Sequence, residues 1–363
     1  MATRRGFLAG LAAAALVPRP TWADVGSPAY LAAAKLPNGA YVLAGLSSNG
    51  TETFRVPLPD RGHAAAAHPT RAEAVAFARR PGTFAVILDC MTGEPKATLQ
   101  AAEGRHFYGH GVFSRDGSLL FTSENDYDGN RGVIAVRDAA TNYLQIDEFP
   151  SGGVGPHDIG RLPGTDTLVV ANGGIGSHPD AGEVDLGVPE MRPNLSYFNA
   201  NGRPSDVVEL APDLWRNSIR HLALRDDGLV AFAMQWHGEE AEIPPLVGLH
   251  RQGEAPRLLS APGPLQPEMR GYAGSVALSQ DGRRVAISSP PGGQVHIWDV
   301  ESGAWVDRLM LTDTCGLSSG PEGFVATTGL GVVVGIRGST SGWQRQHDGA
   351  WDNHLVRIAG DTV

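Results

Sequence analysis

The stretch GHGVFSRDGSLLFTSEND, residues 109–126, has the pattern that decides the fold. An alternating run of about five residues meets the Asp-Gly pair at 116–117 and is followed by a more apolar run, which predicts a β-hairpin. His110 stands where the first strand of this hairpin is expected to begin. Comparable hairpin segments occupy residues 62–82, 156–174, 220–238, 273–293 and 315–331, so the pattern is one copy of a repeat.

The repeat has the period of a β-propeller blade. The equivalent first positions are His63, His110, His157, His221, Gly274 and Cys315, which are separated by 47, 47, 64, 53 and 41 residues. In most copies two further β-rich runs follow the hairpin, which makes four strands for each unit. The 64-residue step contains the insertion GGIGSHPDAGEVDLGVPEMRPN at 173–194, and so long a loop is expected to fold across the channel mouth as a lid.

The two ends of the chain supply a seventh blade. Residues 30–37, 41–48 and 51–59 read as three strands, and the segment WDNHLVRIAG at 351–360 reads as one lone strand. Joining that strand, as the innermost, to the three N-terminal ones closes the ring and places His354 in phase with the other histidines. The sequence therefore predicts an all-β, seven-bladed propeller of four-stranded blades that forms a single domain over residues 24–363.

The N-terminal segment MATRRGFLAGLAAAALVPRPTWADVG has the pattern of a twin-arginine signal peptide, residues 1–23. Arg4 and Arg5 precede an apolar run at 7–17 that is too short to span a bilayer, and cleavage is expected after Ala23. We therefore expect a periplasmic protein that is exported already folded and has no membrane span once the signal is removed. The net charge of −10 argues against nucleic acid as a partner. The protein is expected to be a monomer.

Five imidazoles are expected to surround the propeller axis at one channel mouth. Five of the twelve histidines share the repeat phase, namely His63, His110, His157, His221 and His354. Imidazole is the commonest metal ligand in proteins and suits Fe, Cu, Zn and Ni, and a thiolate at Cys315 would add a soft ligand. We expect a transition-metal site that holds iron or copper. The alternative is that these are structural residues that hydrogen-bond neighbouring blades.

A second layer of candidate ligands follows the second strands, whose ends face the same mouth. The candidates there are Glu124, Asp126, His178 and His237. For each residue taken alone, a role in turn formation at the strand end is an equally good explanation. The remaining histidines, His68, His106, His250, His296 and His347, fall outside the repeat phase and are expected to have packing or surface roles. Cys90 and Cys315 lie 225 residues apart, and the sequence supplies no geometry for a disulfide between them.

As a set, the motifs GHGVFSRDG, SENDYD, GPHDIG, VANGGI, SIRHLA and AWDNHL resemble the domain-of-unknown-function 1513 family of exported propellers over nearly the whole mature chain. Genes of that family are commonly found beside imelysin-like proteins and di-haem oxidoreductases in bacterial iron-uptake clusters. The resemblance thus implies a periplasmic role in iron acquisition with such a partner. The site carries over to His110, His157, His221 and His354, whereas Gly274 in YAGSVA interrupts the ring.

Two other classes of function remain open at this stage. A non-catalytic scaffold would use the same polar loops to bind a partner of the iron-uptake system. A calcium-dependent hydrolase or lactonase would use oxygen ligands, for which Glu124, Asp126 and Asn172 are the candidates. Imidazoles at the axis argue against calcium, which prefers oxygen.

Overall fold

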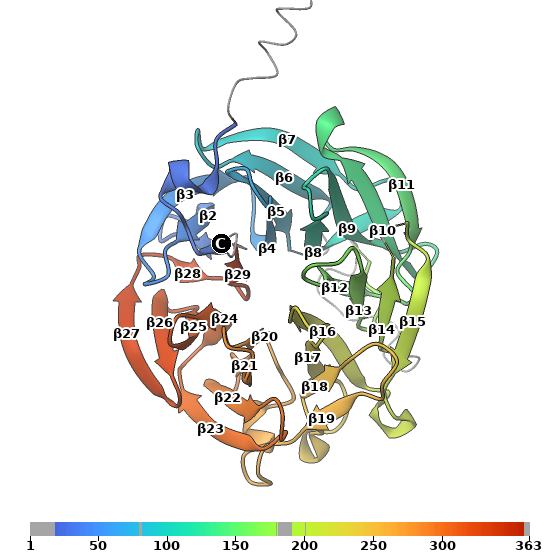
Figure 1. Ribbon diagram of the computed structural model, residues 1–363, viewed down its shortest axis with the longest axis vertical. Coiled ribbons are helices and arrows are strands. Elements are labelled where there is room, and N and C mark those ends of the chain that lie inside the picture. Colours follow the sequence, from blue (N-terminus) through green and yellow to red (C-terminus); the bar gives the residue numbers. More distant parts are fainter. Residues whose placement is uncertain (1–18, 80–81, 179, 181–190, 200, 359–363) are drawn as a thin grey trace, which may run out of the picture.

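In the computed structural model the chain forms a ring of antiparallel sheets around a central axis (Figure 1). The structure describes residues 19–79, 82–178, 180, 191–199 and 201–358. Seven sheets occur in this part of the chain, and we number them as blades 1 to 7 from the N-terminus. The predicted seven-bladed propeller with four-stranded blades is confirmed.

The strands are grouped here by their position in the blade. The innermost strands of blades 2 to 7 are β4 (Gly62–Ala67), β8 (Arg105–Phe113), β12 (Pro156–Arg161), β16 (Asn217–Leu224), β20 (Ser275–Leu278) and β24 (Thr314–Gly320). The second strands of blades 1 to 7 are β1 (Tyr30–Lys35), β5 (Glu73–Ala78), β9 (Leu119–Asp126), β13 (Leu168–Asn172), β17 (Val230–Trp236), β21 (Arg284–Ser289) and β25 (Gly323–Thr328). The third strands are β2 (Tyr41–Leu46), β6 (Phe84–Asp89), β10 (Arg131–Asp138), β14 (Asn194–Phe198), β18 (Val247–His250), β22 (Gln294–Asp299) and β26 (Val332–Arg337). The outermost strands are β3 (Glu52–Leu58), β7 (Glu94–Gln100), β11 (Leu144–Pro150), β15 (Pro204–Glu209), β19 (Arg257–Leu259), β23 (Trp305–Met310) and β27 (Thr340–Gln346). The described helices are short 3-10 turns: η1 (Trp22–Val25), η2 (Ala139–Thr141), η5 (Pro212–Leu214), η6 (Glu240–Glu242) and η7 (Pro267–Met269).

Blade 1 is closed by both ends of the chain, as predicted, but its innermost strand is split. Strand β28 (Ala350–Trp351) pairs with the end of β1, and β29 (Val356–Arg357) pairs with its start. The prediction of one continuous strand was wrong for residues 352–355. The side chain of Asp352 accepts a hydrogen bond from the backbone N–H of Asn353 at 2.8 Å, which is turn chemistry rather than ladder pairing. The break releases His354 from the ladder.

The innermost strands share a second irregularity. In β4, β8, β12, β16 and β24 the pairing register shifts near the predicted ring position. Such bulges add a residue, bend the strand and redirect side chains, and they concentrate next to functional sites. By contrast, β20, which follows Gly274, pairs with β21 in unbroken register from Ser275 to Leu278.

The start of the innermost strand was predicted wrongly in two blades. Strand β8 begins at Arg105 and β16 begins at Asn217, so His110 and His221 lie inside their strands rather than at the first residue. The bulges account for this difference. They let the strand begin earlier and still present a histidine toward the axis.

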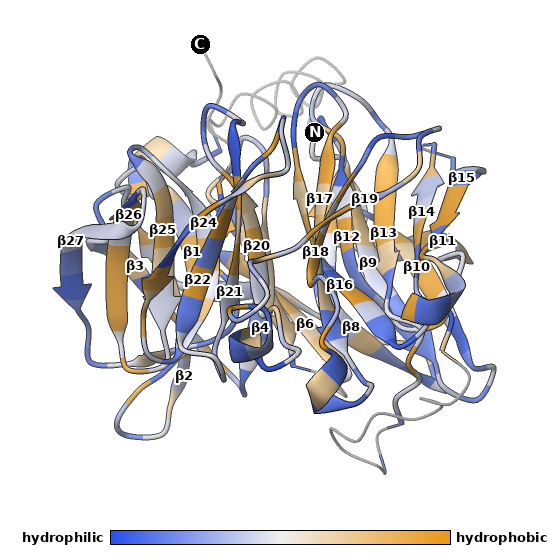
Figure 2. Cartoon of the chain, turned by 90° about the horizontal axis from the view of Figure 1, so that it is seen from below, coloured by the Kyte–Doolittle hydropathy of each residue, from blue (hydrophilic) through white to orange (hydrophobic). Residues whose placement is uncertain are grey.

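Figure 2 shows that many strands carry hydrophobic residues, and apolar side chains of adjacent blades pack together. Between blades 6 and 7, for example, Ala277 and Ile297 pack with Phe324, Ala326 and Val334. Successive side chains of a strand point to opposite faces of the sheet, so each middle strand packs one set of side chains against each neighbouring blade. Both sets are buried because both faces are covered.

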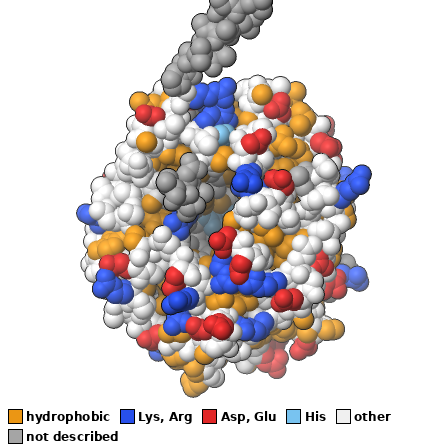
Figure 3. Space-filling view, in the orientation of Figure 1, with side chains coloured by type: hydrophobic (Ala, Val, Ile, Leu, Met, Phe, Trp, Pro, Cys, Tyr) orange, Lys and Arg blue, Asp and Glu red, His pale blue; other side chains and the backbone are white. Residues whose placement is uncertain are grey.

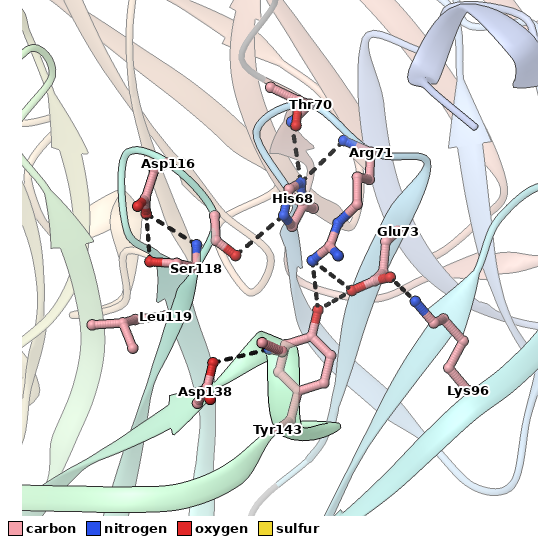
Figure 4. Close-up of polar contacts among 12 residues, drawn as sticks. His68, Thr70, Arg71, Glu73, Lys96, Asp116, Ser118, Leu119, Asp138 and Tyr143 are labelled. Carbon is pink, nitrogen blue, oxygen red and sulfur yellow. Dashed lines mark hydrogen bonds and ion pairs between the residues drawn. The ribbon is translucent and has the colours of Figure 1, made fainter. Parts of the chain in front are cut away.

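The short N-terminal segment before β1 is part of this packed structure. Trp22 is 9 % exposed and packs between blades 1 and 2, and its indole N–H donates to the carbonyl of His68 at 2.8 Å. The backbone N–H of Ala72 donates to the carbonyl of Pro20 at 2.9 Å. Figure 4 shows the loop that receives this segment, with His68, Thr70 and Arg71 on it. Cleavage after Ala23, the position expected from the sequence, would separate Trp22 from the domain.

Trp22→Ala is expected to lower the free energy of unfolding by about 3 kcal/mol, because a buried aromatic ring is lost and a cavity is left. Urea unfolding followed by far-ultraviolet circular dichroism measures this change. Trp22→Phe keeps a smaller aromatic ring and loses the N–H bond to His68, so a smaller loss of about 1–2 kcal/mol is expected. Equal stability of Trp22→Ala and the parent protein would show that the segment does not contribute to the fold.

Candidate metal centre

The five predicted imidazoles meet at the propeller axis. The His63 ring lies 4.4 Å from that of His354 and 5.2 Å from that of His110, measured between ring centroids. The His157 and His221 rings are 4.8 Å apart, and His221 is also 4.8 Å from His354. Each of the five is buried, with 4–8 % of its surface exposed. A histidine side chain is visible in the central opening of the space-filling view (Figure 3).

Two carboxylates orient two of these rings. Nδ1 of His110 lies 3.0 Å from Oδ1 of Asp158, and Nδ1 of His63 lies 3.4 Å from Oδ1 of Asp352. A carboxylate accepts hydrogen bonds, so the hydrogen bond with Asp352 puts the proton of neutral His63 on Nδ1 and its lone pair on Nε2, and the close contact of Asp158 with Nδ1 of His110 favours the same tautomer there. Carboxylates hold metal-binding histidines in this way and fix both the tautomer and the ring angle. Nε2 of His110 is buried and has no hydrogen-bond partner among the described residues.

His63 and His354 face each other through their Nε2 atoms, which are 3.2 Å apart. Since Nε2 of His63 carries the lone pair, Nε2 of His354 is the donor in this contact, and its proton has to move to Nδ1 before Nε2 can bind a metal. Two nitrogens bound to one tetrahedral ion with bonds of about 2.0–2.1 Å lie about 3.3 Å apart. The observed spacing thus suits an ion in place of the shared proton.

Two groups of three histidines have nitrogens close enough to bind one ion. His63, His110 and His354 form one group, and His110, His157 and His221 form the other, with the nitrogens of each group within 4.8 Å of one another. His110 belongs to both groups, so the two sites overlap.

Burial favours the neutral form of four of these imidazoles. Burial lowers the pKa of His63 from 6.5 to about 4, although the nearby Asp352 opposes the shift. Burial also holds the pKa of His157, His221 and His354 well below 6.5, with further lowering by Arg220 at the first two and by the neighbouring His63 at the third. Burial alone would raise the pKa of Asp352, yet the His63 ring and the Arg61 guanidinium hold it well below its usual range. Neutral imidazoles with available lone pairs are the form that binds metal.

Acid is expected to destabilise the metal-free protein. Below pH 6.5 the unfolded chain protonates His63, whereas the folded chain does so only near its pKa of about 4. The unfolded state then binds more protons, so the free energy of unfolding falls as pH drops from about 6.5 to 4, by about 3 kcal/mol for this one group. Urea unfolding at pH 7, 6, 5 and 4 measures the slope. His63→Gln, whose side chain does not titrate, should flatten it, and an unchanged slope would contradict the account.

The other candidate ligands lie apart from the two groups and have other contacts. Glu124 is buried and its carboxylate pairs with Arg137 at 2.9 Å. Asp126 pairs with Arg131 at 2.7 Å and caps a turn. His178 packs edge-on against Tyr127. The backbone N–H of His237 donates a hydrogen bond to the carbonyl of Arg216.

Cys315 is near the ring, but its chemistry does not favour a ligand. Its Sγ donates to the carbonyl of Asp313 at 3.2 Å, and burial raises the pKa of the thiol to about 12. A metal would have to displace this proton for Cys315 to bind as a thiolate, and Cys315 is in neither group of converging side chains. Cys90 and Cys315 are both buried and free.

The oxygen ligands named for calcium are already engaged in hydrogen bonds and ion pairs. Besides the arginine partners of Glu124 and Asp126, the Asn172 amide bonds to Ser151 and Asn194. These contacts join strands within blade 4 and its neighbour. They give Asn172 a structural role at the end of β13.

Half of the predicted lid at 173–194, residues 179 and 181–190, lies outside the described residues. Its first residues leave β13 beside the start of β12, which carries His157. They are held by His106, whose Nε2 lies 2.8 Å from Oγ of Ser177, and by Tyr108, whose hydroxyl donates to the carbonyl of Ile175 at 2.8 Å. His106, which the sequence predicts to have a packing or surface role, therefore anchors the insertion to blade 3.

Sequence reasoning missed three residues at the site: Asp158, Asp352 and Arg220. Asp158 directly follows His157 in PHDIG and Asp352 precedes His354 by two residues in WDNH, so an acidic residue beside a ring histidine was an available signal. Each carboxylate, however, orients the histidine of another blade rather than its sequence neighbour. The position of an aspartate next to a histidine in the sequence therefore does not predict which histidine it contacts.

Comparison with known proteins supports the fold. Hydrazine synthase of Kuenenia stuttgartiensis matches with a TM-score of 0.61 and 15 % identity, over 80 % of this chain and 86 % of that chain. A chain in a crystal structure of the mitotic checkpoint complex matches with a TM-score of 0.57 and 12 % identity, over 79 % of this chain and 81 % of that one. Identities this low show a shared fold only.

No curated protein matches the sequence. None of the helices in the described part of the chain has the length and apolar character of a membrane span. A family model does match, over residues 56–358, and it covers the ring histidines, both aspartates beside them and the whole of blades 2 to 7. The chain therefore belongs to the family described as "Protein of unknown function (DUF1513)".

Proposed function

We propose that this propeller binds one transition-metal ion, iron or copper, through Nε2 of His63, His110 and His354. The observation that carries the proposal is the pair of aspartate-oriented imidazoles, His110 with Asp158 and His63 with Asp352, which converge with His354 within 4.8 Å. A structural role alone does not need a buried imidazole nitrogen without a partner, such as Nε2 of His110.

The donor set favours a transition metal over calcium or magnesium. Three neutral imidazoles suit Fe, Cu, Zn and Ni, whereas the hard cations take oxygen ligands. Three protein ligands also leave a coordination position open, which is typical of sites that act on a bound molecule or exchange their ion. A closed structural site would have four.

The cellular setting follows from the sequence and is part of the proposal. The twin-arginine pattern at Arg4 and Arg5 supports export of the folded chain to the periplasm. The family resemblance supports a role in iron acquisition, with an imelysin-like protein or an oxidoreductase as the partner. In that setting the hub would hold or hand over the ion, and the blades would keep the imidazoles in place.

Asp158→Asn tests the proposed site without removing a ligand. The amide can present either a donor or an acceptor to Nδ1 of His110, so the tautomer is no longer fixed, and metal affinity should fall 10- to 100-fold, by about 1.4–2.7 kcal/mol. Titration of metal-free protein with Fe²⁺ or Cu²⁺ against a chromophoric chelator measures the affinity.

Asp116→Asn is a matched control, because Asp116 caps an exposed turn of blade 3 and should leave the affinity unchanged. If Asp158→Asn bound metal as tightly as the parent protein, the carboxylate would have no part in the site.

A further inference from the structure

His157 differs from the other four histidines because it accepts a hydrogen bond from an arginine. NH1 of Arg220 lies 3.2 Å from Nδ1 of His157. A guanidinium group carries only donors, so Nδ1 of His157 must be the acceptor in this contact. A neutral imidazole with its lone pair on Nδ1 carries its proton on Nε2. Neither nitrogen of His157 then has a lone pair left for a metal.

Arg220 reaches His157 from a bulge in the neighbouring blade. Its side chain is 2 % exposed, and it is the additional residue in the β16 bulge, between Ile219, which pairs with Met234, and His221, which pairs with Ala233. Ser218, two residues before Arg220, donates its hydroxyl to the carbonyl of Gly173 at 2.8 Å. The bulge thus turns the guanidinium from β16 of blade 5 toward β12 of blade 4.

The charge of Arg220 also separates the two overlapping groups of histidines. A fixed positive charge beside His157 repels a cation bound there, and the repulsion is strong because the site is buried. The group formed by His63, His110 and His354 lies beside two carboxylates, Asp158 and Asp352, of which Asp352 is also paired with Arg61 and Arg79. The charge of Arg220 favours an anion on the His157 side of the histidine ring.

We propose that His157 is a hydrogen-bond donor and not a metal ligand, and that its Nε2–H, with the charge of Arg220 behind it, holds a small anion at the open position of the metal. This inference rests on the proposed metal site. The His157 ring lies 5.3 Å from His110, 4.8 Å from His221 and 6.0 Å from His63, between centroids, so it borders the ion on one side.

A second observation points to a ligand on the same side. Nδ1 of His221 is buried without a hydrogen-bond partner among the described residues, and the His221 ring is 4 % exposed. Buried polar atoms are normally satisfied, and a small bound molecule would supply the missing partner. Since the His157 ring lies 4.8 Å from His221 and 5.3 Å from His110, between centroids, a ligand that contacts these rings can have only a few atoms.

Azide is a suitable probe, because it is a small anion that accepts hydrogen bonds and gives an absorption band when it binds Cu²⁺. Cu²⁺-loaded protein is titrated with azide in three forms: parent, His157→Leu and His157→Gln. Each form should bind the same amount of Cu²⁺. The leucine variant should bind azide at least about 10-fold more weakly, and the glutamine variant, whose amide restores an N–H donor, should recover most of the affinity.

Two results of this titration would overturn the inference. If Cu²⁺ stoichiometry fell in His157→Leu, the imidazole would be a ligand. If azide bound His157→Leu as tightly as the parent, the residue would not be its donor.

A second measurement needs no metal. Nitrogen-15 NMR of the imidazoles in metal-free protein should show His157 protonated on Nε2, and Arg220→Met should remove the preference for this tautomer. A proton on Nδ1 of His157 would overturn the inference even if the metal site proved correct. Absence of Cu²⁺ binding in the parent, with His157 in the expected tautomer, would contradict the proposed function instead.

Discussion

His110→Ala is expected to lower the affinity of the metal-free protein for Cu²⁺ by about 1000-fold or more, which corresponds to about 4 kcal/mol. His110 belongs to both groups of three histidines, so its loss leaves no complete group among the described residues. The effect should exceed that of Asp158→Asn, because a ligand is removed rather than reoriented. Competition with a chromophoric chelator at pH 7 gives the dissociation constant.

The control for this variant is His347→Ala. His347 lies outside the ring and contacts the carbonyl of Gly50, so its replacement should leave Cu²⁺ affinity unchanged. Urea unfolding of both variants separates loss of binding from loss of fold. Parent-like affinity in a folded His110→Ala protein would exclude the proposed ligand set.

Deleting the residues from 350 onward is expected to lower the free energy of unfolding by about 5 kcal/mol or more. The deletion removes β28 and β29, which pair with β1, and the buried side chains of Trp351, Leu355 and Ile358. Each buried large side chain contributes about 1.5–3 kcal/mol, and the edge of β1 is left unpaired. Urea unfolding and the soluble yield both report the change.

A chain that ends at Ile358 is the matched control, because it keeps β28, β29 and all three buried side chains. It should unfold at the same urea concentration as the full chain. If the longer deletion were equally stable, blade 1 would not depend on the C-terminal segment, and ring closure by both termini would be wrong.

The fold could be predicted because its signals are local. The Asp-Gly turn at 116–117, for example, is closed by the side chain of Asp116 on Ser114 and Ser118, and neighbouring blades repeat the same hairpin. Turn chemistry and alternation fix each hairpin without reference to the rest of the chain. The repeat period then gives the ring, and the chain ends give its closure.

The site could be predicted only in part, because its geometry depends on contacts between blades. Repeat phase identified all five imidazoles, but the bulges that direct them, such as the one that contains Arg220, leave no clear mark in the sequence. Asp158 and Asp352 each orient a ring from another strand. These partners are set by the packing of one blade against the next.

His157 shows the limit most clearly. Repeat phase makes it equivalent to His110 and predicts the same role for both. In the structure His110 faces a carboxylate and His157 faces a guanidinium, so the two rings carry their protons on opposite nitrogens. Residue type and spacing alone could not distinguish a ligand from a donor.

The most direct test of the metal centre is elemental analysis of the protein as it is exported. Chain purified from the periplasm without added chelator should contain about one iron or copper ion per molecule. A variant with both His63 and His110 replaced by alanine, purified in the same way, should contain less than about a tenth of that amount. Folded parent protein that carries no transition metal, and takes up none when Fe²⁺ or Cu²⁺ is supplied, would contradict the account.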